Sequence, residues 1–363
     1  MLAHTMAEAL VIRPGLLTTV QDVGRWGFQS RGVPVAGPMD SYAHRLANAF
    51  VGNAAESATL EVTLVGPELE FDDERVVAVA GARFEVTVDG HLAPMNAPFP
   101  VFAGSRLTFG ARVRGARAYV AISGGIGVMK VFGSRATHVG SRMGGVDGRP
   151  LEAGDRLPLG DPAGPSRSVS EKREHAPSRP ASPAKTSSIR GMTARAARLL
   201  GARAALLGRA PSAGHAPDGR DMPDGHARVR VLLGPQHDCF TDEALRTLEG
   251  APYRISQQSD RMGFRLEGAP LTHSRGADII SDATPMGALQ VPGSGLPILL
   301  MADRQTTGGY PKIATLITAD LRLAGQLAPG DTISFAVCSP GEAMAALIAQ
   351  ERRLMAVERP EVA

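Results

Sequence analysis

Apolar and polar residues alternate along most of the first 160 positions in the manner of short β-strands. In residues 75–90 (RVVAVAGARFEVTVDG) the pattern predicts two strands, the second with Phe84, Val86 and Val88 on one face. The Asp-Gly pair at residues 89–90 is typical of a hairpin turn, because both residues tolerate the positive φ angle that such a turn requires. Residues 105–125 continue the alternation, so we expect a β-rich body with many turns.

Helical spacing of apolar residues appears in only a few places, so helices are expected as accessories to the strands. Each candidate has a residue type that favours helix initiation or an apolar stripe at intervals of three and four residues. The predicted helices are residues 38–53, with Asp40 as N-cap and a stop at Gly52-Asn53; residues 242–249, capped by Thr241 and ended by Gly250; and the terminal residues 340–358.

One long segment interrupts both patterns. Residues 163–227 are rich in Ser, Pro, Ala, Arg and Gly, a composition that cannot bury enough apolar surface to offset the entropy of ordering. We interpret this segment as a flexible linker, although residues 193–207 within it are compatible with a short helix. Because 363 residues exceed what one core usually supports, we predict an N-terminal β domain over 1–162 and a C-terminal β domain over 228–363.

The two predicted domains share short sequence echoes. Arg25-Trp26-Gly27-Phe28 resembles Arg261-Met262-Gly263-Phe264, and LEAGDRLPL (151–159) resembles LAPGDTISF (327–335). Each block opens with the first motif and closes with the second, which favours a duplication. The predicted architecture is therefore mainly β, with two related domains in tandem.

Charge and cysteine content narrow the class of protein. The net charge is +3, but residues 161–228 hold 12 of the 39 Lys and Arg residues and 6 of the 36 Asp and Glu residues. The rest of the chain is therefore slightly acidic, so we expect no nucleic-acid partner. Two cysteines are too few for a disulfide framework. No long apolar run or charged leader is present, so we expect a cytoplasmic protein that is not bound to a membrane.

A dense polar segment, residues 302–315 (ADRQTTGGYPKIAT), follows an apolar run that reads as a buried strand. Side chains at a strand exit are held rigidly and can converge on a ligand. A carboxylate there can accept a proton, cations can stabilise an oxyanion, and paired glycines let a ligand approach the backbone. The catalytic candidates are Asp303, Arg304, Tyr310 and Lys312, and the substrate-binding candidates are Gln305, Thr306, Thr307, Gly308 and Gly309. The alternative is an internal Asp-Arg ion pair that stabilises a sheet corner.

Two further segments carry the same residue types. Residues 256–265 (SQQSDRMGFR) could read an amide group, or form a polar turn whose aspartate caps local backbone amides. The substrate-binding candidates here are Gln257, Gln258, Ser259, Asp260 and Arg261, to which we add Gln290. The N-terminal counterparts are Gln21, Asp22, Arg25 and Asp40, whereas Trp26, the only tryptophan, is expected in the core.

Several standard motifs are missing from the sequence. It contains no G-x-x-x-x-G-K-[ST] phosphate loop, no G-x-G-x-x-G between a strand and a helix, and no G-x-S-x-G elbow. The nine histidines lack metal-ligand spacing, so no metal site is expected. Met129-Lys130 is similar to a biotin carrier tetrapeptide, but the chain around it does not read as a compact hairpin domain, and we do not interpret Lys130 as a biotinylation site.

Residues 15–40, 257–268, 279–292 and 302–315 together resemble a known family, the KipA-like proteins, also called allophanate hydrolase subunit 2 or the C subunit of 5-oxoprolinase. These proteins are similar to part of the carboxyltransferase domain of urea carboxylase. The resemblance implies two cyclophilin-like β-barrel domains and an active site near a surface shared with a KipI-like B subunit, with an oxoprolinase A subunit as a further partner.

The resemblance leaves three activities open. The chain could be the C subunit of a 5-oxoprolinase, which opens the lactam of 5-oxoproline with ATP shared among the subunits. It could instead transfer carboxylate from carboxybiotin on a separate carrier to urea or a related amide. Both activities require recognition of a planar amide and stabilisation of negative charge on its oxygen. The third is a non-catalytic regulator that binds KipI or a kinase. For the enzymes, we expect replacement of Asp303 or Lys312 by Ala to abolish turnover while the fold stays intact.

Overall fold

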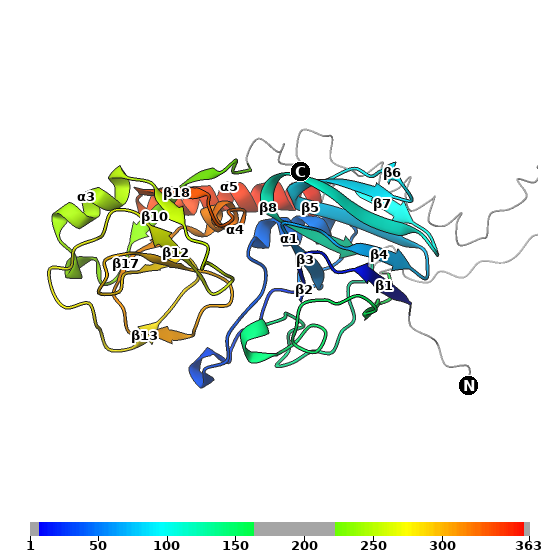
Figure 1. The fold of residues 1–363 in the computed structure, drawn as a ribbon, viewed down its shortest axis with the longest axis horizontal. Coiled ribbons are helices and arrows are strands. Elements are labelled where there is room, and N and C mark those ends of the chain that lie inside the picture. The colour runs from blue at the N-terminus through cyan, green and yellow to red at the C-terminus, as the bar shows by residue number, and fades with distance from the viewer. Residues whose placement is uncertain (1–6, 163–221, 359–363) are drawn as a thin grey trace, which may run out of the picture.

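The structure is a computed structural model that describes residues 7–162 and 222–358, and it contains two β-sheet bodies that lie side by side (Figure 1). The first body is built by residues 7–162 and the second by residues 222–358. The mainly β fold predicted from the sequence is confirmed, with one sheet a half-barrel and the other a barrel. Residues 163–221, most of the predicted linker with its helix-compatible stretch 193–207, lie outside the described residues.

The first body is a nine-stranded sheet in which the path β2-β3-β8-β4-β1-β9 is extended by β5, β6 and β7. All its hydrogen-bonded strand pairs are antiparallel. Its strands are β1 (Glu8–Arg13), β2 (Leu17–Gln21), β3 (Thr59–Thr63), β4 (Glu68–Phe71), β5 (Arg75–Val88), β6 (His91–Leu92), β7 (Pro98–Val101), β8 (Arg106–Ile122) and β9 (Arg156–Pro158).

The prediction of two strands in residues 75–90 is wrong, because β5 runs unbroken from Arg75 to Val88. Its pairing with β8 shifts register three times between Gly81 and Val86, so the strand bends through bulges instead of ending. Gly81 adopts a φ of 98°, a conformation that favours glycine. The predicted hairpin turn follows directly: Asp89 and Gly90 both have positive φ, and Val88 pairs with His91.

Small side chains on one face of β5 and β8 bring a helix close to the sheet. Val77 and Val120 point into the sheet's own core, whereas Ala78 and Ala121 belong to a second cluster on the other face. Helix α1 (Ser41–Phe50) packs on that second face with an apolar stripe. The Asp40 carboxylate accepts from the backbone N–H of Ala43, which confirms the predicted N-cap.

The second body is a closed barrel in the order β10-β17-β14-β15-β12-β11-β18, with a separate two-stranded antiparallel sheet of β13 and β16. Its strands are β10 (His226–Leu233), β11 (Tyr253–Ile255), β12 (Gly263–Glu267), β13 (Asp282–Ala283), β14 (Ala288–Gln290), β15 (Ile298–Leu300), β16 (Thr307–Gly308), β17 (Lys312–Leu316) and β18 (Thr332–Val337). Strand β10 therefore begins two residues before the predicted domain boundary at 228.

The barrel carries short helices at its edges. Helix α3 (Asp242–Gly250) is capped by Thr241, as predicted, and extends one residue further than expected. The short elements η5 (Thr318–Asp320) and α4 (Leu321–Gly325) lead into the last strand. Short 3₁₀ turns also occur as η1 (Gln29–Arg31), η2 (Val139–Ser141) and η4 (His237–Cys239).

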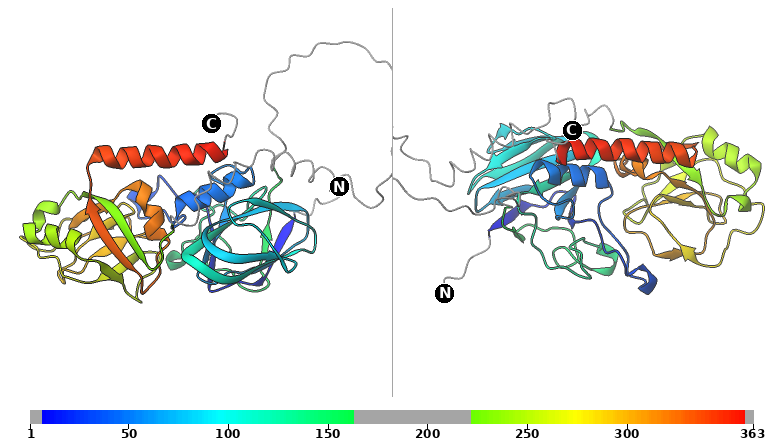
Figure 2. Two further views of the ribbon diagram at one scale, coloured as in Figure 1. Left: turned by 90° about the horizontal axis from the view of Figure 1, so that it is seen from above. Right: turned by 180° about the vertical axis from the view of Figure 1, so that it is seen from behind.

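The terminal helix α5 (Pro340–Glu358) joins the two bodies, since it starts at the barrel and lies over α1 of the first body (Figure 2). Leu354 and Val357 are buried in the same cluster as the apolar stripe of α1. Arg45 on α1 also forms an ion pair with Glu351 at 2.8 Å. The last element of the chain is therefore part of the contact between the two bodies.

The Gly-Asp motif makes the same turn in both bodies. Gly154 and Gly330 have φ angles of 92° and 97°. The carboxylate of Asp155 accepts from the Glu152 N–H at 2.7 Å, and that of Asp331 accepts from the Ala328 N–H at 2.8 Å. The two turns therefore share both features, which is compatible with the predicted duplication.

Candidate functional site

Loops from both bodies meet at a junction that we call the seam. It is formed by residues 22–40 after β2, residues 134–145 after β8, and residues 301–305 after β15. The tip of the blue loop after β2 and the green loop after β8 lie on the side of the molecule away from α5 (Figure 1). One contact between the bodies is direct: the His138 ring lies with Nε2 3.3 Å from the Asp303 carbonyl oxygen. Some of the predicted site residues lie at this seam and others lie away from it.

A buried ion pair ties two predicted segments together. The Nε and Nη2 groups of Arg261 donate to the two carboxylate oxygens of Asp303 at 3.0 and 3.1 Å. Arg261 also donates to Glu61 on β3 and, at 2.6 Å, to the Gly37 carbonyl. Although burial opposes the charged form, the carboxylates of Asp303 and Glu61 raise the pKa of Arg261 above its ordinary value. Asp303 and Arg261 thus have the geometry of the structural ion pair that the sequence left open as an alternative.

The network continues into the first body through Glu61. Its carboxylate accepts from the Tyr119 hydroxyl at 2.7 Å and from the Met39 N–H at 2.8 Å. The Tyr119 hydroxyl in turn accepts from the Asp40 N–H at 2.8 Å. Burial favours the neutral form of Glu61, but the charge of Arg261 and the other partners together outweigh burial and lower the pKa of Glu61. The carboxylate is therefore held charged, with hydrogen bonds to both of its oxygens.

Gln326 joins the barrel to the first body a short distance away. Its amide NH2 donates to the Asp40 carboxylate at 2.8 Å and to the Arg117 carbonyl at 2.9 Å. Its amide oxygen accepts from the backbone N–H groups of Ala116 and Arg117. Burial raises the pKa of Asp40, although the hydrogen bond from Gln326 opposes that shift. Asp40 thus serves as a helix cap and as a link between the bodies.

Arg25 is a buried cation of the seam with incomplete hydrogen bonding, and Nε of Arg117 and Oε1 of Gln21 also lack partners among the described residues. Arg25 is fully buried, and its Nη2 donates to the Ala136 carbonyl. Within the part of the chain that the structure describes, its Nε and Nη1 have no hydrogen-bond partner. Burial lowers the pKa of its guanidinium, although Asp22 and Asp303 are close enough to oppose that shift. A buried cation with unused donors is costly, so these donors are suited to an anionic ligand.

The loop over Arg25 is built from glycines. Gly144 has a φ of 68°, and a Cβ at this position would lie 2.1 Å from both the Ala136 oxygen and the Arg25 guanidinium. The loop can therefore approach Arg25 only because residue 144 lacks a side chain. Asp22 fixes the other end of the loop, since its carboxylate accepts from the Ser134 hydroxyl and the Arg135 N–H at 2.5 Å each.

Of the remaining candidates after β15, Arg304 is buried, whereas Gln305, Thr307 and Tyr310 are exposed. The Arg304 Nε donates to the Thr284 carbonyl at 2.7 Å, and burial lowers the pKa of its guanidinium. Gln305 donates to Gln290 at 3.2 Å, and Gln290 lies 3.5 Å from the Tyr310 carbonyl. Within the same segment, the Thr306 carbonyl accepts from the Thr284 N–H, and the Gly309 carbonyl accepts from the Ile279 N–H. Thr307 and Gly308 form β16. The Tyr310 side chain is exposed.

Lys312 lies away from Asp303 and pairs with a different carboxylate. Its Nζ is 2.8 Å from Asp282, whose side chain is half exposed. That hydrogen bond is the largest cause of the lowered pKa of Asp282. Gln236 donates to the same carboxylate at 3.4 Å. Because both Lys312 and Asp303 are buried in ion pairs, their replacement affects packing as well as chemistry.

The turn before β12 faces outward. Gln257 and Gln258 are exposed, and Ser259 exchanges hydrogen bonds with the Arg265 backbone. The Asp260 carboxylate accepts from the Met262 N–H at 2.8 Å, which matches the alternative of a local cap. At the N-terminal counterpart, Gln21 is buried and donates to Thr19 and to the Thr137 carbonyl.

The expectation that Trp26 belongs to the core is wrong. Its side chain is 61% exposed, and its Nε1 donates to the Val23 carbonyl at 2.8 Å. The two flanking glycines, Gly24 and Gly27, both have positive φ, so the backbone turns the indole outward instead of continuing the strand.

Sequence reasoning missed several residues of the seam: Glu61, Arg117, Tyr119, His138 and Gln326. Only Glu61 carried a local signal, because it stands within the fully buried strand TLEVT, where an acidic residue requires a partner. Within residues 7–162 and 222–358, the structure has no cluster of His, Cys, Asp or Glu that could hold a metal ion, and no helix there could span a membrane.

Comparison with known proteins gives consistent results. Residues 31–337 match the family model described as "Carboxyltransferase domain, subdomain A and B". The chain is 35% identical over 342 residues to the C subunit of the Escherichia coli 5-oxoprolinase, covering 94% of this chain and 95% of that protein. The crystal structure of the Kluyveromyces lactis urea amidolyase aligns with 98% of this chain at 30% identity and a TM-score of 0.78. The chain spans only 20% of that structure. The crystal structure of the K. lactis urea carboxylase aligns with 97% of this chain at 31% identity and the same TM-score, and the chain spans 29% of it.

Proposed function

Because the chain belongs to the family of the carboxyltransferase domain, subdomains A and B, we propose that it is the C subunit of an ATP-dependent 5-oxoprolinase. In this assembly it contributes to the binding of 5-oxoproline before the lactam is opened. The near-complete coverage of the bacterial relative supports this choice, since the alignment spans 94% of this chain and 95% of that protein.

The observation that carries the proposal is the guanidinium of Arg25, buried with two groups that lack partners among the described residues. 5-Oxoproline combines a planar amide with a carboxylate, and guanidinium N–H groups form charge-assisted hydrogen bonds with a carboxylate. Urea carries no charge and would leave the buried cation uncompensated. The donor set therefore favours a ligand that carries a carboxylate over urea itself.

The internal repeat offers a comparison for this assignment. Arg25 and Arg261 stand at the same place in the repeated Arg-x-Gly-Phe motif. Arg261 is saturated by Asp303 and Glu61, whereas among the described residues Arg25 has the Ala136 carbonyl as its one hydrogen-bond acceptor. We assign Arg261 to holding the two bodies together and Arg25 to ligand binding.

The role of Asp303 in this proposal is positioning. Its backbone carbonyl faces His138 and its carboxylate orients Arg261, so it fixes the wall of the seam beside Arg25. The His138 Nδ1 accepts from the Ser141 N–H at 3.1 Å, so in the neutral ring the proton lies on Nε2, which points at the Asp303 carbonyl. These bonds hold the glycine-rich loop in place.

ATP hydrolysis would supply the free energy for opening the lactam. A single guanidinium fits one carboxylate and not a triphosphate, and the sequence has no phosphate loop. We therefore assign nucleotide binding to the partner subunits, a KipI-like B subunit and an oxoprolinase A subunit. Active turnover then requires the assembled complex.

A carboxyltransferase acting on urea is the second candidate. It is favoured by the alignment with the K. lactis urea carboxylase structure. In that case Arg25 would hold the carboxylate of carboxybiotin, which is again a carboxylate on a planar amide. The same donors fit both groups, so the seam geometry is compatible with either activity.

An assay of the assembled complex distinguishes the two. The purified complex is tested for ATP-dependent conversion of 5-oxoproline to glutamate, and separately, with a biotin carboxylase and a biotin carrier, for carboxylation of urea. We expect glutamate formation that requires this chain. Urea carboxylation without glutamate formation would replace the proposal by the second candidate. Binding of a kinase without either activity would favour a regulator.

A further inference from the structure

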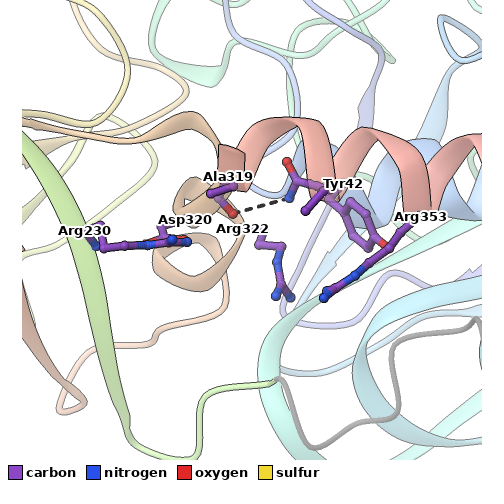
Figure 3. Close-up of a pocket in the computed structure, with 9 residues that line it drawn as sticks. Tyr42, Arg230, Ala319, Asp320, Arg322 and Arg353 are labelled. Atoms are coloured by element: carbon purple, nitrogen blue, oxygen red, sulfur yellow. Dashed lines mark hydrogen bonds and ion pairs between the residues drawn. The ribbon is translucent and has the colours of Figure 1, made fainter. Parts of the chain in front are cut away.

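The side of the molecule that carries α5 holds a cavity of about 330 Å³ where charged side chains contact groups of the same chain (Figure 3). Arg230 pairs with Asp320 at 2.7 Å, and the guanidinium of Arg322 lies 5.6 Å from the centre of the Tyr42 ring. These contacts link α1 of the first body to β10, η5 and α4 of the second. This side of the molecule therefore holds the two bodies together.

The other side exposes a surface of a different character, which we call the loop surface. It is formed by residues 23–28 after β2 and residues 127–146 after β8. The two loops reach the side of the molecule away from α5 (Figure 1). Their most exposed apolar side chains are Trp26, Met129, Phe132 and Val139, which are 61%, 80%, 50% and 38% exposed. Exposed apolar residues are ordinary when they stand singly, but a group of them beside polar residues marks a contact surface.

Aromatic contact joins the two loops into one surface. The rings of Phe28 and Phe132 lie 5.1 Å apart, and Trp26 stands two positions before Phe28. Asp22, directly before the first loop, accepts from the Ser134 hydroxyl in the second loop at 2.5 Å. The apolar side chains are therefore carried by loops that are fixed to each other.

The internal repeat shows that the fold does not require these residues to be exposed. Phe264, which occupies the place of Phe28 in the repeated motif, is buried in the barrel core. In the second body the motif continues into β12, whereas in the first body the chain turns at η1 after Phe28. The packing of a core therefore does not explain why the first body displays this motif on a loop.

The loop surface is also basic. Residues 23–28 and 127–146 contain Arg25, Lys130, Arg135 and Arg142 but no Asp or Glu. Lys130 and Arg142 are exposed. Complementary charge speeds the encounter of two proteins, and exposed tryptophans often become the dominant contacts of an interface. The surface thus fits a protein that presents acidic residues around an apolar centre.

We propose that the loop surface docks the nucleotide-carrying subunit of the complex, the KipI-like B subunit, through an acidic and apolar face of that subunit. The choice of occupant rests on the proposed function. Opening of the lactam with ATP requires the nucleotide to reach the ligand at Arg25, and this chain has no phosphate loop. Because Arg25 directly precedes Trp26, a subunit seated on the loop surface lies beside that ligand. Trp26 and Phe132 are the central contacts, and Lys130 and Arg142 steer the approach.

The test measures binding of the purified chain to the purified B subunit by surface plasmon resonance, without 5-oxoproline or ATP. We expect Trp26→Ala combined with Phe132→Asn to raise the Kd at least about thirtyfold, as for the loss of central aromatic contacts. Phe132 has a φ of 50°, which asparagine tolerates, so the turn is retained. The matched control is Leu92→Ala combined with Phe102→Asn, which changes exposed apolar residues in β6 and directly after β7 and should bind like wild type. These strands lie level with α5 in Figure 1.

A charge-reversing pair separates steering from packing. Lys130→Glu combined with Arg142→Asp should lower the association rate constant at least about fivefold at low salt and change the dissociation rate constant less. Arg246→Glu combined with Arg254→Glu alters the charge of the chain equally at exposed positions of α3 and β11, and should associate like wild type. An equal loss in both pairs would show that only the net charge of the chain matters, which contradicts a basic docking surface.

Hydrogen exchange of the wild-type chain provides a measurement that needs no variant. Binding of the B subunit should slow amide exchange in residues 23–28 and 127–146. Unchanged exchange in both loops within a formed complex would contradict the proposal.

The proposal is overturned if the B subunit does not bind the wild-type chain, or binds the double variant of Trp26 and Phe132 as tightly as the control. A dimer of this chain, or a complex with the A subunit alone, that the double variant abolishes would assign the loop surface to that occupant instead. Because binding is measured without turnover, the proposed function is judged separately. A complex that depends on Trp26 and Phe132 but forms no glutamate would refute the activity and leave the docking surface standing.

Discussion

Replacement of Asp303 by Asn measures how much the ion pair between Asp303 and Arg261 contributes to the stability of the chain. The substitution keeps the size of the side chain but removes the negative charge that faces Arg261. It also places an amide NH2 against the N–H groups that Asp303 now accepts at 3.0 and 3.1 Å. Both partners are almost fully buried, with side chains 7% and 6% exposed, so water cannot replace the lost contacts.

The size of the effect follows from the pairing. Removing one member of a buried ion pair costs about 3–5 kcal/mol, because the remaining charge is left uncompensated. Glu61 stays in contact with Arg261, so we expect the lower end, about 3 kcal/mol. For a body of this size, a loss of that magnitude lowers the unfolding midpoint by about 6–12 °C. This differs from the sequence-based expectation that Asp303 can be replaced with the fold intact.

The assay is thermal unfolding of the purified chain by circular dichroism and calorimetry. Asp238→Asn is the matched control, because Asp238 pairs with Arg275 at 3.3 Å while both side chains are more than half exposed. We expect the control to unfold with wild type, as exposed pairs contribute little. A midpoint for Asp303→Asn within about 2 °C of the control would refute the claim that this ion pair holds the seam together.

Three further predictions concern other buried contacts. Burial lowers the pKa of His44 to about 4, below its unfolded value of 6.5, so the unfolded chain binds the proton first. About 3 kcal/mol of stability is therefore lost as pH falls from 6.5 to 4. His44→Gln should flatten this pH dependence of the free energy of unfolding in denaturant titrations, and an unchanged pH dependence would contradict the prediction. Gly144→Ala should lower the free energy of unfolding by about 1–3 kcal/mol more than Gly133→Ala. Both positions have positive φ, but only at Gly144 would the Cβ meet a backbone carbonyl. Equal thermal unfolding midpoints for the two variants would disprove the close approach of the loop at Gly144 to the Ala136 carbonyl. Gln326→Ala should destabilise by about 3 kcal/mol, since it leaves buried backbone N–H groups and Oδ2 of Asp40 without their hydrogen bonds to Gln326. A loss below about 1 kcal/mol in chemical unfolding would argue against this link.

The elements that depend on neighbouring residues could be predicted from the sequence. The Asp89-Gly90 turn, the Asp40 and Thr241 caps and the terminal helix all follow from preferences that act over a few positions. The single strand β5 was missed because a bulge at Gly81 bends a strand without leaving a polar gap in the pattern.

The seam could be predicted only in part. Motif density brought attention to Arg261 and Asp303, but it could not show that their side chains pair with each other. Glu61 lies 200 positions from Arg261, and no local pattern links residues at such a distance. The contrast between the saturated Arg261 and the incompletely paired Arg25 became visible only in three dimensions.

The most direct test of the account is one comparison in the assembled complex, made with Arg25→Gln and with Arg31→Gln, an exposed arginine six residues away. Arg25 is a buried cation whose pKa is lowered by burial, so its removal should leave the unfolding midpoint of the chain equal to or above that of wild type. The same substitution should raise the KM for 5-oxoproline at least about tenfold, because the carboxylate loses a charged hydrogen-bond partner. Unchanged KM values in both variants would contradict the assignment of Arg25 as the ligand-binding residue.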